Sequence, residues 1–293
     1  MATNNLTGDS FTSQAEPLSL NSEQATSLIV EHAKQLVNRL VEQRGHEKPP
    51  FSPEEFARLQ GIKKIVKADL GKTSAVLLRF HDGYVIKVNK NHNLARQNFS
   101  CAHEIGHILF GELKLERYIE NIEYRTFNPQ ARALTRARAR ERLCEAAATE
   151  LLMPEMVFNK YLLDFGVSVH SIELLANIFR VSIRTTAIRI AEVSAEPCIA
   201  LLWLSRPGTK SKALQLAWRV GPGIKLTGRS YYMPVHTRVA YPSTLHKAYE
   251  NDKPVKSFKL FKLDTAVKRC PMESKGFGRG ETRYVISLAF PDR

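Results

Sequence analysis

His103-Glu104-Ile105-Gly106-His107 places two histidines four residues apart, with a glutamate directly after the first. At this spacing two imidazoles stand on one face of a helix and can bind one metal ion together, a pattern typical of zinc. Glu104 leans over the same side of the ion, where a carboxylate can accept a proton from water. The motif therefore predicts Zn²⁺ bound by His103 and His107, and hydrolysis with Glu104 as the general base. The alternative is a surface helix whose histidines bind nothing.

The segments around the motif predict a mixture of strands and helices. Residues 76–81 and 84–88 flank Asp82-Gly83, a dipeptide suited to the positive φ angles of a type I′ turn, which indicates a β-hairpin. The pattern becomes helical near Asn98 and carries both histidines, with Gly111 as the expected C-cap. A second helix over about residues 136–153 ends at Pro154. The metal motif is thus expected on a helix.

A catalytic zinc ion needs a third protein ligand, and a His-bearing extension of the motif cannot supply it. The metzincin pattern requires Gly at 110 and His at 113, where this chain has Phe110 and Leu113. Glu141 and Glu145 lie about one turn apart on the second helix, so one could bind zinc while the other orients a histidine. Glu141 is the first choice and Glu145 the second. The alternative is an exposed acidic pair balanced by neighbouring arginines.

Three blocks in order resemble one known family. The chain reads Phe-Ser-Cys-Ala-His-Glu-Ile-Gly-His-Ile-Leu at 99–109, a run ending Glu-Leu-Leu-Met-Pro at 141–154, and Leu-Ala-Asn-Ile-Phe-Arg-Val-Ser at 175–182. Together, over roughly residues 50–193, they resemble the ImmA/IrrE family of zinc metallopeptidases, whose domain is the IrrE N-terminal-like domain. The resemblance implies zinc bound by His103, His107 and Glu141, with Glu104 as general base. It also implies cleavage of a helix-turn-helix repressor, which relieves transcriptional repression in a stress response or a mobile element.

The composition of the 293 residues indicates a globular protein of the reducing cytoplasm. Hydrophobic residues make up 43% of the chain, enough to bury a sizeable core. No apolar run approaches the roughly 20 residues that cross a bilayer, and the N-terminus has no secretory apolar region. The four cysteines show no paired spacing. Of the net charge of +14, residues 196–293 hold 18 Lys/Arg against 7 Asp/Glu, which favours contact with nucleic acid or another anionic partner.

These patterns predict an α+β fold in four segments. Residues 1–20 are expected as a disordered tail, followed by a helical zincin-like peptidase domain with a small hairpin or sheet at 21–165. A helix-turn-helix-like segment follows at 166–195, and a basic β-rich module of unknown role at 196–293. In the third segment Arg180 occupies the turn position often filled by glycine. Its helices either read DNA, or pack against the peptidase core or dock the substrate.

Several assignments stay open in the sequence. Four residues are candidates for stabilising an oxyanion without spacing evidence: Tyr118, Tyr124, His81 and His92. The arginines at 132–142 form either a solvated helix surface or a segment that docks phosphate or substrate. The function that these features favour is a zinc endopeptidase acting on a repressor. The alternative is a DNA-binding or sensory regulator built on a peptidase fold with a non-catalytic metal site.

Overall fold

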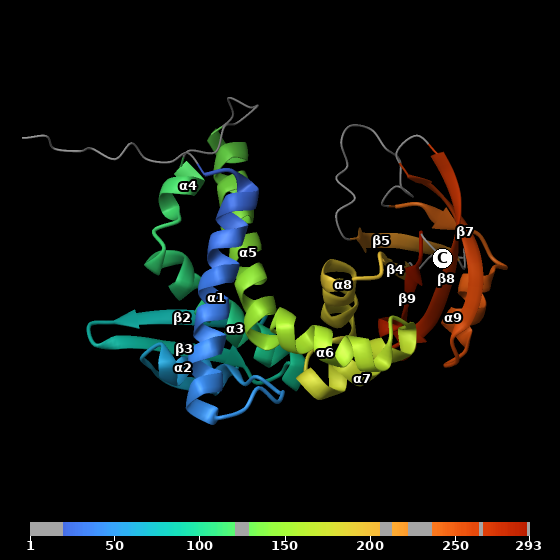
Figure 1. Ribbon diagram of the computed structural model, residues 1–293. Coiled ribbons are helices and arrows are strands. Elements are labelled where there is room, and N and C mark those ends of the chain that lie inside the picture. The colour runs from blue at the N-terminus through green and yellow to red at the C-terminus, as the bar shows by residue number, and fades with distance from the viewer. Residues whose placement is uncertain (1–19, 121–128, 206–212, 222–235, 264–265, 292–293) are drawn as a thin grey trace, which may run out of the picture.

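The chain folds into a helical part that carries a small sheet, followed by a larger antiparallel sheet (Figure 1). The computed structural model describes residues 20–120, 129–205, 213–221, 236–263 and 266–291. Apart from Leu20, the expected N-terminal tail lies outside these residues. Because helices and sheets occupy separate stretches of the chain, the fold is of the predicted α+β class.

Two helices open the described chain. Helix α1 (Ser22–Arg44) begins at a capping box, in which Asn21 Oδ1 accepts a hydrogen bond from the Gln24 N–H and the Gln24 side chain accepts one from the Asn21 N–H. Helix α2 (Pro53–Leu59) starts with proline at its first position, as its sequence predicts. Helix α1 packs along α5, described below, and so forms one wall of the helical part.

The small sheet has the strand order β1-β3-β2, so β2 lies at an edge. The predicted hairpin is confirmed as the antiparallel pair of β2 (Ala75–Phe80) and β3 (Gly83–Asn89). The predicted type I′ turn is wrong: Gly83 has a φ of 134°, but Asp82 does not take a positive φ. Gly83 pairs with Phe80, which makes His81-Asp82 the two-residue loop. Strand β1 (Ile62–Ala68) pairs parallel to β3, and the sequence patterns above do not predict it.

Helix α3 (Leu94–Glu112) carries the histidine motif. It begins earlier than expected, because Asn93 caps its first turn by accepting a hydrogen bond from the Arg96 N–H. Gly111 is not its C-cap: the helix continues through Glu112, and Lys114 takes the left-handed conformation with a φ of 52°. Three helices follow: α4 (Glu116–Glu120), α5 (Pro129–Leu152), which ends before Pro154 as predicted, and α6 (Glu155–Phe165).

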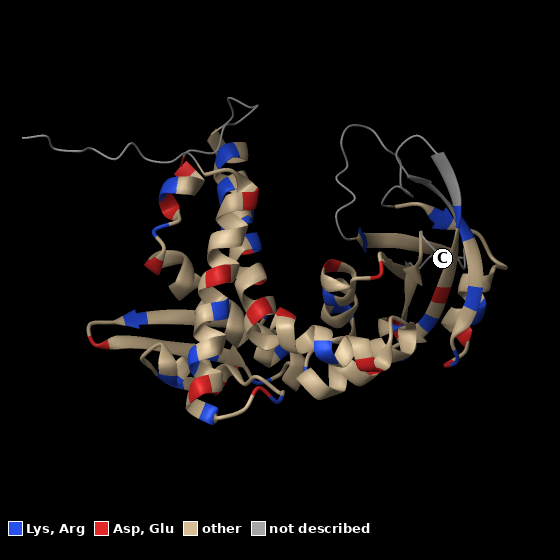
Figure 2. Ribbon diagram, in the orientation of Figure 1, with Lys and Arg blue, Asp and Glu red and all other residues tan. Residues whose placement is uncertain are grey.

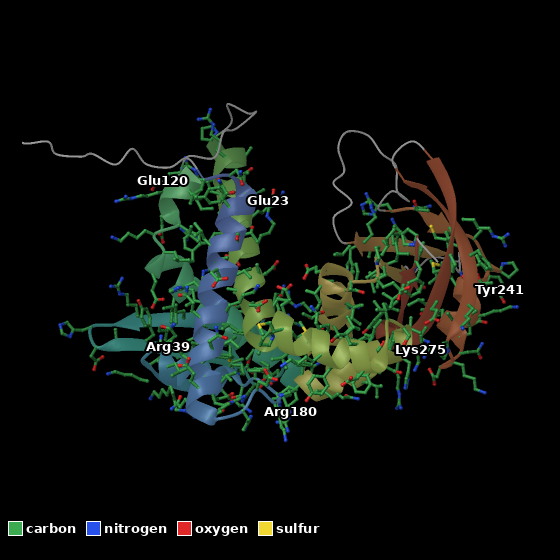
Figure 3. All side chains as sticks on the ribbon, viewed as in Figure 1. Glu23, Arg39, Glu120, Arg180, Tyr241 and Lys275 are labelled. Atoms are coloured by element: carbon green, nitrogen blue, oxygen red, sulfur yellow. The ribbon has the colours of Figure 1, made fainter. Side chains whose placement is uncertain are left out.

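Helices α7 (Val169–Phe179) and α8 (Ile183–Val193) are joined by a short turn at the predicted place. Arg180 takes the left-handed conformation there, with a φ of 54°, and its side chain is exposed at the surface (Figure 3). Helix α8 itself is largely covered, because Thr186, Ala187 and Ile190 are buried. It contacts α6 and α7 on the helical side and β4 and β5 on the sheet side.

The C-terminal sheet has the order β6-β5-β4-β9-β8-β7, and the paired strands are antiparallel. Its strands are β4 (Ile199–Ser205), β5 (Leu214–Val220), β6 (Arg238–Val239), β7 (Val255–Leu263), β8 (Ala266–Phe277) and β9 (Tyr284–Ala289). A helix, α9 (Thr244–Glu250), and a 3-10 turn, η1 (Gly280–Thr282), interrupt them. The sequence predicts β4, β5 and β9. Lys and Arg positions recur along this sheet (Figure 2).

One hydrophobic core extends from the helices into the sheet. It joins α1, α3, α5, α7 and α8 to one face of the sheet through Ala200, Leu202 and Leu288. The opposite face of the sheet forms a smaller core with α9 around Trp203, Leu216 and Leu245. Within the described residues, each helix is too short or too polar to cross a bilayer.

Candidate metal centre

The packing of α3 against α5 positions the candidate metal ligands. A Cβ added at Gly106 would stand 2.7 Å from the carbonyl oxygen and 3.1 Å from the Cα of Cys144. Real Cβ atoms do not approach that closely, so only glycine allows the two helices to lie at this distance. Ala102, Ala147 and Ala148 are buried and keep the same interface narrow. The close approach brings the middle of α5, from Glu141 to Cys144, alongside the histidine motif.

His103, His107 and Glu141 come together at this interface. The Nε2 atom of His103 lies 3.0 Å from Glu141 Oε2, and the Nε2 atom of His107 lies 3.8 Å from Glu141 Oε1. The two imidazole rings are nearly perpendicular, with centroids 4.8 Å apart. One ligand atom from each residue can be chosen so that all three lie within 4.8 Å of one another. The structure thus juxtaposes the three residues that the sequence proposes as ligands.

The cluster fits a zinc ion with one coordination position left for substrate. Ligand atoms about 2.1 Å from a tetrahedral ion stand about 3.4 Å apart, close to the separations found here. Two imidazole nitrogens and one carboxylate are also a donor set of catalytic zinc sites. The side chains of His103 and His107 are 16% and 25% exposed, and that of Glu141 is 51% exposed, so the cluster opens to solvent. A substrate could reach it.

Glu104 lies beside the cluster, between α3 and the edge strand β2. Burial raises the pKa of its carboxyl group, whereas the charge of His103 and a hydrogen bond from the Leu77 backbone N–H lower it. Burial also lowers the pKa of His107, as does the nearby His103, while Glu141 raises it. A half-buried carboxylate of increased basicity suits the role of general base.

Cys144 contacts the far side of one imidazole ring. Its Sγ atom lies 3.2 Å from His107 Nδ1, the ring nitrogen opposite the one that faces Glu141. Burial raises the pKa of this thiol to about 12, so the group stays protonated at neutral pH. The sequence predicts inert packing for Cys101 and Cys144. Both are buried, but Cys144 additionally contacts His107.

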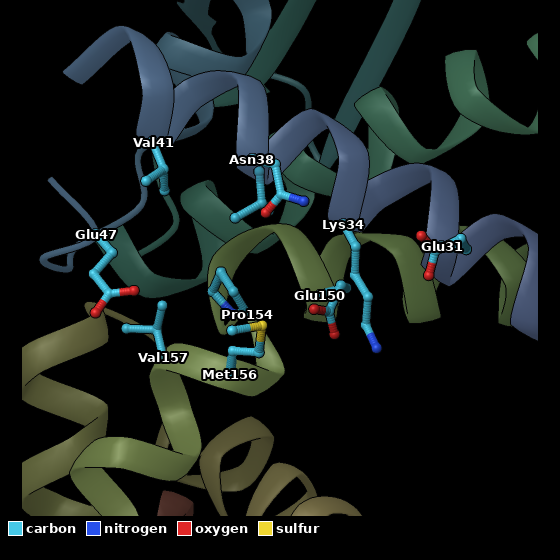
Figure 4. A pocket seen from close by; sticks show the side chains of 10 residues that line it. Glu31, Lys34, Asn38, Val41, Glu47, Glu150, Pro154, Met156 and Val157 are labelled. Atoms are coloured by element: carbon cyan, nitrogen blue, oxygen red, sulfur yellow. The ribbon is translucent and has the colours of Figure 1, made fainter. Parts of the chain in front are cut away.

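The other acidic residues of α5 lie apart from the cluster. Glu145, the second choice from the sequence, is exposed on α5 and does not belong to the group of ligand atoms found among the described residues. Glu150 is 1% exposed and forms an ion pair with Arg189 of α8. It also borders a pocket of about 270 Å³ between α1 and the start of α6. Figure 4 shows Pro154 and Val157 lining the same pocket. The geometry therefore favours Glu141 as the third ligand.

The structure gives no oxyanion-stabilising role to Tyr118, His81 or His92, the three candidates from the sequence that lie among the described residues. Tyr118 is buried on α4, and His81 lies in the exposed β2–β3 loop. His92 precedes α3 and has a buried Nδ1 without a hydrogen-bond partner. Tyr124 falls outside the described residues. Sequence spacing contains no signal that would separate them.

The arginine-rich half of α5 lies next to α4. The guanidinium of Arg140 lies 5.3 Å from the centre of the Phe110 ring, and Arg136 Nη2 donates to the Glu120 carbonyl oxygen at 3.3 Å. Arg132 and Arg136 border an open groove of about 540 Å³ together with Glu116 and Glu120. These arginines thus contact α3, through Phe110, and α4, through Glu120.

A helix bearing HExxH, a small sheet whose edge strand borders it, and a second helix that brings a glutamate to the histidines define a zincin-like, metallopeptidase-type fold. Residues 60–191 match the family described as the IrrE N-terminal-like domain. This part of the chain is therefore an IrrE N-terminal-like domain, and the resemblance to the ImmA/IrrE family is confirmed.

One solved structure extends the similarity beyond that domain. A Mycobacterium tuberculosis transcriptional regulator matches with a TM-score of 0.58 and 15% sequence identity, over 92% of this chain and 80% of that chain. At this identity the likeness concerns the fold alone. It nevertheless spans most of the helical part and the C-terminal sheet together. The comparison with curated protein sequences gave no match.

Proposed function

We propose that the protein is a zinc-dependent endopeptidase that cleaves a helix-turn-helix transcriptional repressor. The observation that carries the proposal is the cluster of His103, His107 and Glu141, with Glu104 directly beside it. When bound, zinc would supply Lewis-acid chemistry at a peptide carbonyl and favour deprotonation of water. His103, His107 and Glu141 hold the ion, and Glu104 accepts the proton of the attacking water and passes it to the leaving amine.

The free edge of β2 offers a place for an extended peptide. The carbonyl oxygen of Ser74 accepts a hydrogen bond from the Asn89 N–H, 2.9 Å away, so the backbone of Ser74 faces β3. Because backbone groups alternate along an antiparallel strand, those of Ala75 and Leu77 face the free edge. The Leu77 N–H accordingly points to Glu104. A peptide paired with this edge would pass over the general base and the metal ligands.

The replacement Glu104→Gln tests the mechanism. Glutamine keeps the shape of the side chain but cannot act as a base, so zinc should stay bound in a one-to-one ratio while cleavage of repressor proteins is lost. The measurements are metal content by elemental analysis and cleavage followed by mass spectrometry. A Glu104→Gln protein that cleaves as fast as the unchanged protein would refute the mechanism. Candidate substrates are helix-turn-helix repressors encoded next to the gene.

A second candidate function is regulation through DNA binding or sensing, with a non-catalytic metal site. The excess of 18 Lys/Arg over 7 Asp/Glu in residues 196–293 and the shared fold with a transcriptional regulator favour it. The packing of α8 disfavours DNA recognition by this helix. Several of its side chains are buried, and Arg184 at its start stacks on the Tyr284 ring, 4.3 Å from the ring centre. Duplex binding that persists near physiological salt would support regulation, and its absence would count against it.

A further inference from the structure

An open pocket of about 330 Å³ adjoins the candidate metal centre. One wall belongs to the start of the edge strand and the other to α3, whose residues His103 and Glu104 close the end nearest the metal ligands. The lining residues are Ser74, Ala75, Arg96, Phe99, Ser100, His103 and Glu104. A peptide lying along the free edge of β2 would therefore extend a side chain into this pocket.

Arg96 gives the pocket its chemical character. Its side chain is exposed, and its Nη2 atom donates a hydrogen bond to Ser74 Oγ at 3.0 Å, which holds the guanidinium at the start of β2. A guanidinium has five N–H donors, so others remain for a ligand. No carboxylate among the described residues forms an ion pair with Arg96. Phe99 provides a partly buried apolar surface beside it.

The distance from Arg96 to the general base can be expressed in residues of a bound peptide. Helix α3 and strand β2 run side by side in the same direction, because Arg96 contacts Ser74 at one end and Glu104 contacts Leu77 at the other. Eight helical residues from Arg96 to Glu104 span about 12 Å. Three strand residues from Ser74 to Leu77 span about 10 Å. A peptide residue beside Arg96 is therefore about three positions from the bond that Glu104 would attack.

We propose that this pocket selects an acidic side chain, Asp or Glu, located about three residues from the scissile bond of the substrate. The inference rests on the proposed peptidase function, and it adds the class of peptide that the site prefers. A carboxylate pairs with a guanidinium through two parallel hydrogen bonds, which is stronger and more directional than a contact with a neutral side chain. The substrate would therefore carry an acidic residue at a fixed distance from its cleavage point.

The test separates peptide selection from catalysis by using the Glu104→Gln protein as an inert background. The zinc-loaded, immobilised Glu104→Gln protein is incubated with peptides from a chymotryptic digest of a bacterial proteome, a library that retains both acidic and basic residues. Retained peptides are then sequenced by mass spectrometry. Four proteins are compared: Glu104→Gln alone, and Glu104→Gln combined with Arg96→Glu, with Arg96→Met or with Arg279→Glu. Arg279 is exposed in the connection between β8 and β9, where it precedes η1, so its reversal makes the same charge change away from the pocket.

We expect about threefold to tenfold enrichment of Asp and Glu among the peptides retained by the Glu104→Gln protein. The Arg279→Glu control should preserve this enrichment, whereas Arg96→Glu should abolish it and favour Lys and Arg instead. A neutral replacement, Arg96→Met, should remove the preference for either charge. The proposal would be overturned if Glu104→Gln with Arg96→Glu retained peptides with the same Asp and Glu content as Glu104→Gln alone. It would also be overturned if the Glu104→Gln protein retained peptides without any preference.

The retained peptides are finally offered to the unchanged protein. Cleavage at a constant distance of about three residues from the acidic position supports both the selection and the peptidase function. Cleavage at positions unrelated to the acidic residue would overturn the selection rule alone. Selective retention without any cleavage would refute the peptidase function and leave the Arg96 pocket as a binding site for acidic side chains.

Discussion

At the scale of single residues, the two histidines differ in what surrounds them. Both direct Nε2 toward Glu141, but among the described residues only His107 has a hydrogen-bonding contact at its other ring nitrogen, with Cys144 Sγ. A metal-binding imidazole must keep one nitrogen free of a proton, and the partner of the second nitrogen fixes which one that is. Cys144 thus holds the His107 ring in the orientation that a metal ion requires.

Replacement of Cys144 is predicted to weaken zinc binding without removing a ligand. Cys144→Ala deletes the partner of His107 Nδ1, and we expect zinc affinity to fall by about tenfold to a hundredfold. Cys144→Ser keeps an acceptor at nearly the same place, so its affinity should stay closer to that of the unchanged protein. Competition with a chromogenic chelator measures the affinity. The matched control is Cys101→Ala, which alters a buried cysteine of α3, and an equal loss in that protein would contradict the prediction.

At the scale of helices and strands, the ligand cluster depends on one close contact between α3 and α5. Gly106 and Cys144 approach so closely that a Cβ on Gly106 would overlap the backbone of α5. The register of this contact determines which face of α5 meets the histidines, and it brings Glu141 there while Glu145 lies outside the cluster. The position of Glu141 relative to the two histidines therefore depends on how α3 and α5 pack together.

The replacement Gly106→Ala is predicted to separate the two helices and damage the metal site. Either helix must move by several tenths of an ångström, and overpacking of this kind costs about 1–3 kcal/mol of unfolding free energy. Zinc affinity should fall as well, because Glu141 moves with α5. Urea unfolding and chelator competition measure the two effects. Gly111→Ala on the same helix meets open space and should stabilise the protein by up to about 1 kcal/mol, so destabilisation by both replacements would refute the explanation.

The sequence predicts elements whose signals are local and misses those that depend on distant partners. Helix α1 has a capping box, and the hairpin of β2 and β3 has two short apolar runs around a short loop. Strand β1 escapes prediction because lysines interrupt its apolar residues and its pairing with β3 is parallel. Helix α6 escapes because Met156 and Leu163 are exposed, so its sequence shows no simple buried face.

The candidate site follows the same rule: its local part could be predicted from the sequence, and the part that depends on contacts between helices could not. The spacing of His103, Glu104 and His107 is local, so their placement on one helix follows from the sequence. The choice between Glu141 and Glu145 is not local, because both face the same general side of α5 and only the contact at Gly106 separates them. The pocket at Arg96 also depends on tertiary structure, since it forms between α3 and the start of β2.

At the scale of the whole molecule, a buried ion pair joins helix α5, which carries Glu141, to α8. Glu150 and Arg189 are 1% and 7% exposed, and their side chains contact each other. Arg189 Nε also donates to the Met153 carbonyl oxygen at 3.1 Å, and Glu150 Oε1 accepts from the Glu155 N–H at 3.1 Å. Because α8 also packs on β4 and β5, this ion pair lies on the route from the metal centre to the C-terminal sheet.

Replacing one partner of this pair is predicted to destabilise the junction strongly. Glu150→Ala leaves the Arg189 guanidinium buried without its carboxylate, which should lower the unfolding free energy by about 3–5 kcal/mol. The double replacement Glu150→Leu with Arg189→Met should recover much of that loss, since both charges are then absent. Urea unfolding measures the stability, and limited proteolysis between α8 and β4 reports whether the junction opens.

A comparison with an exposed ion pair isolates the effect of burial. Lys160 and Glu47 also form an ion pair, but their side chains are 56% and 46% exposed, so Glu47→Ala should cost less than about 1 kcal/mol. If Glu150→Ala costs no more than Glu47→Ala, the buried pair does not stabilise the junction. If Glu150→Ala unfolds the helical part while proteolysis leaves the link to β4 intact, the pair supports the peptidase domain alone. Loss of stability together with cleavage at that link would show that α8 couples the metal-binding helices to the C-terminal sheet.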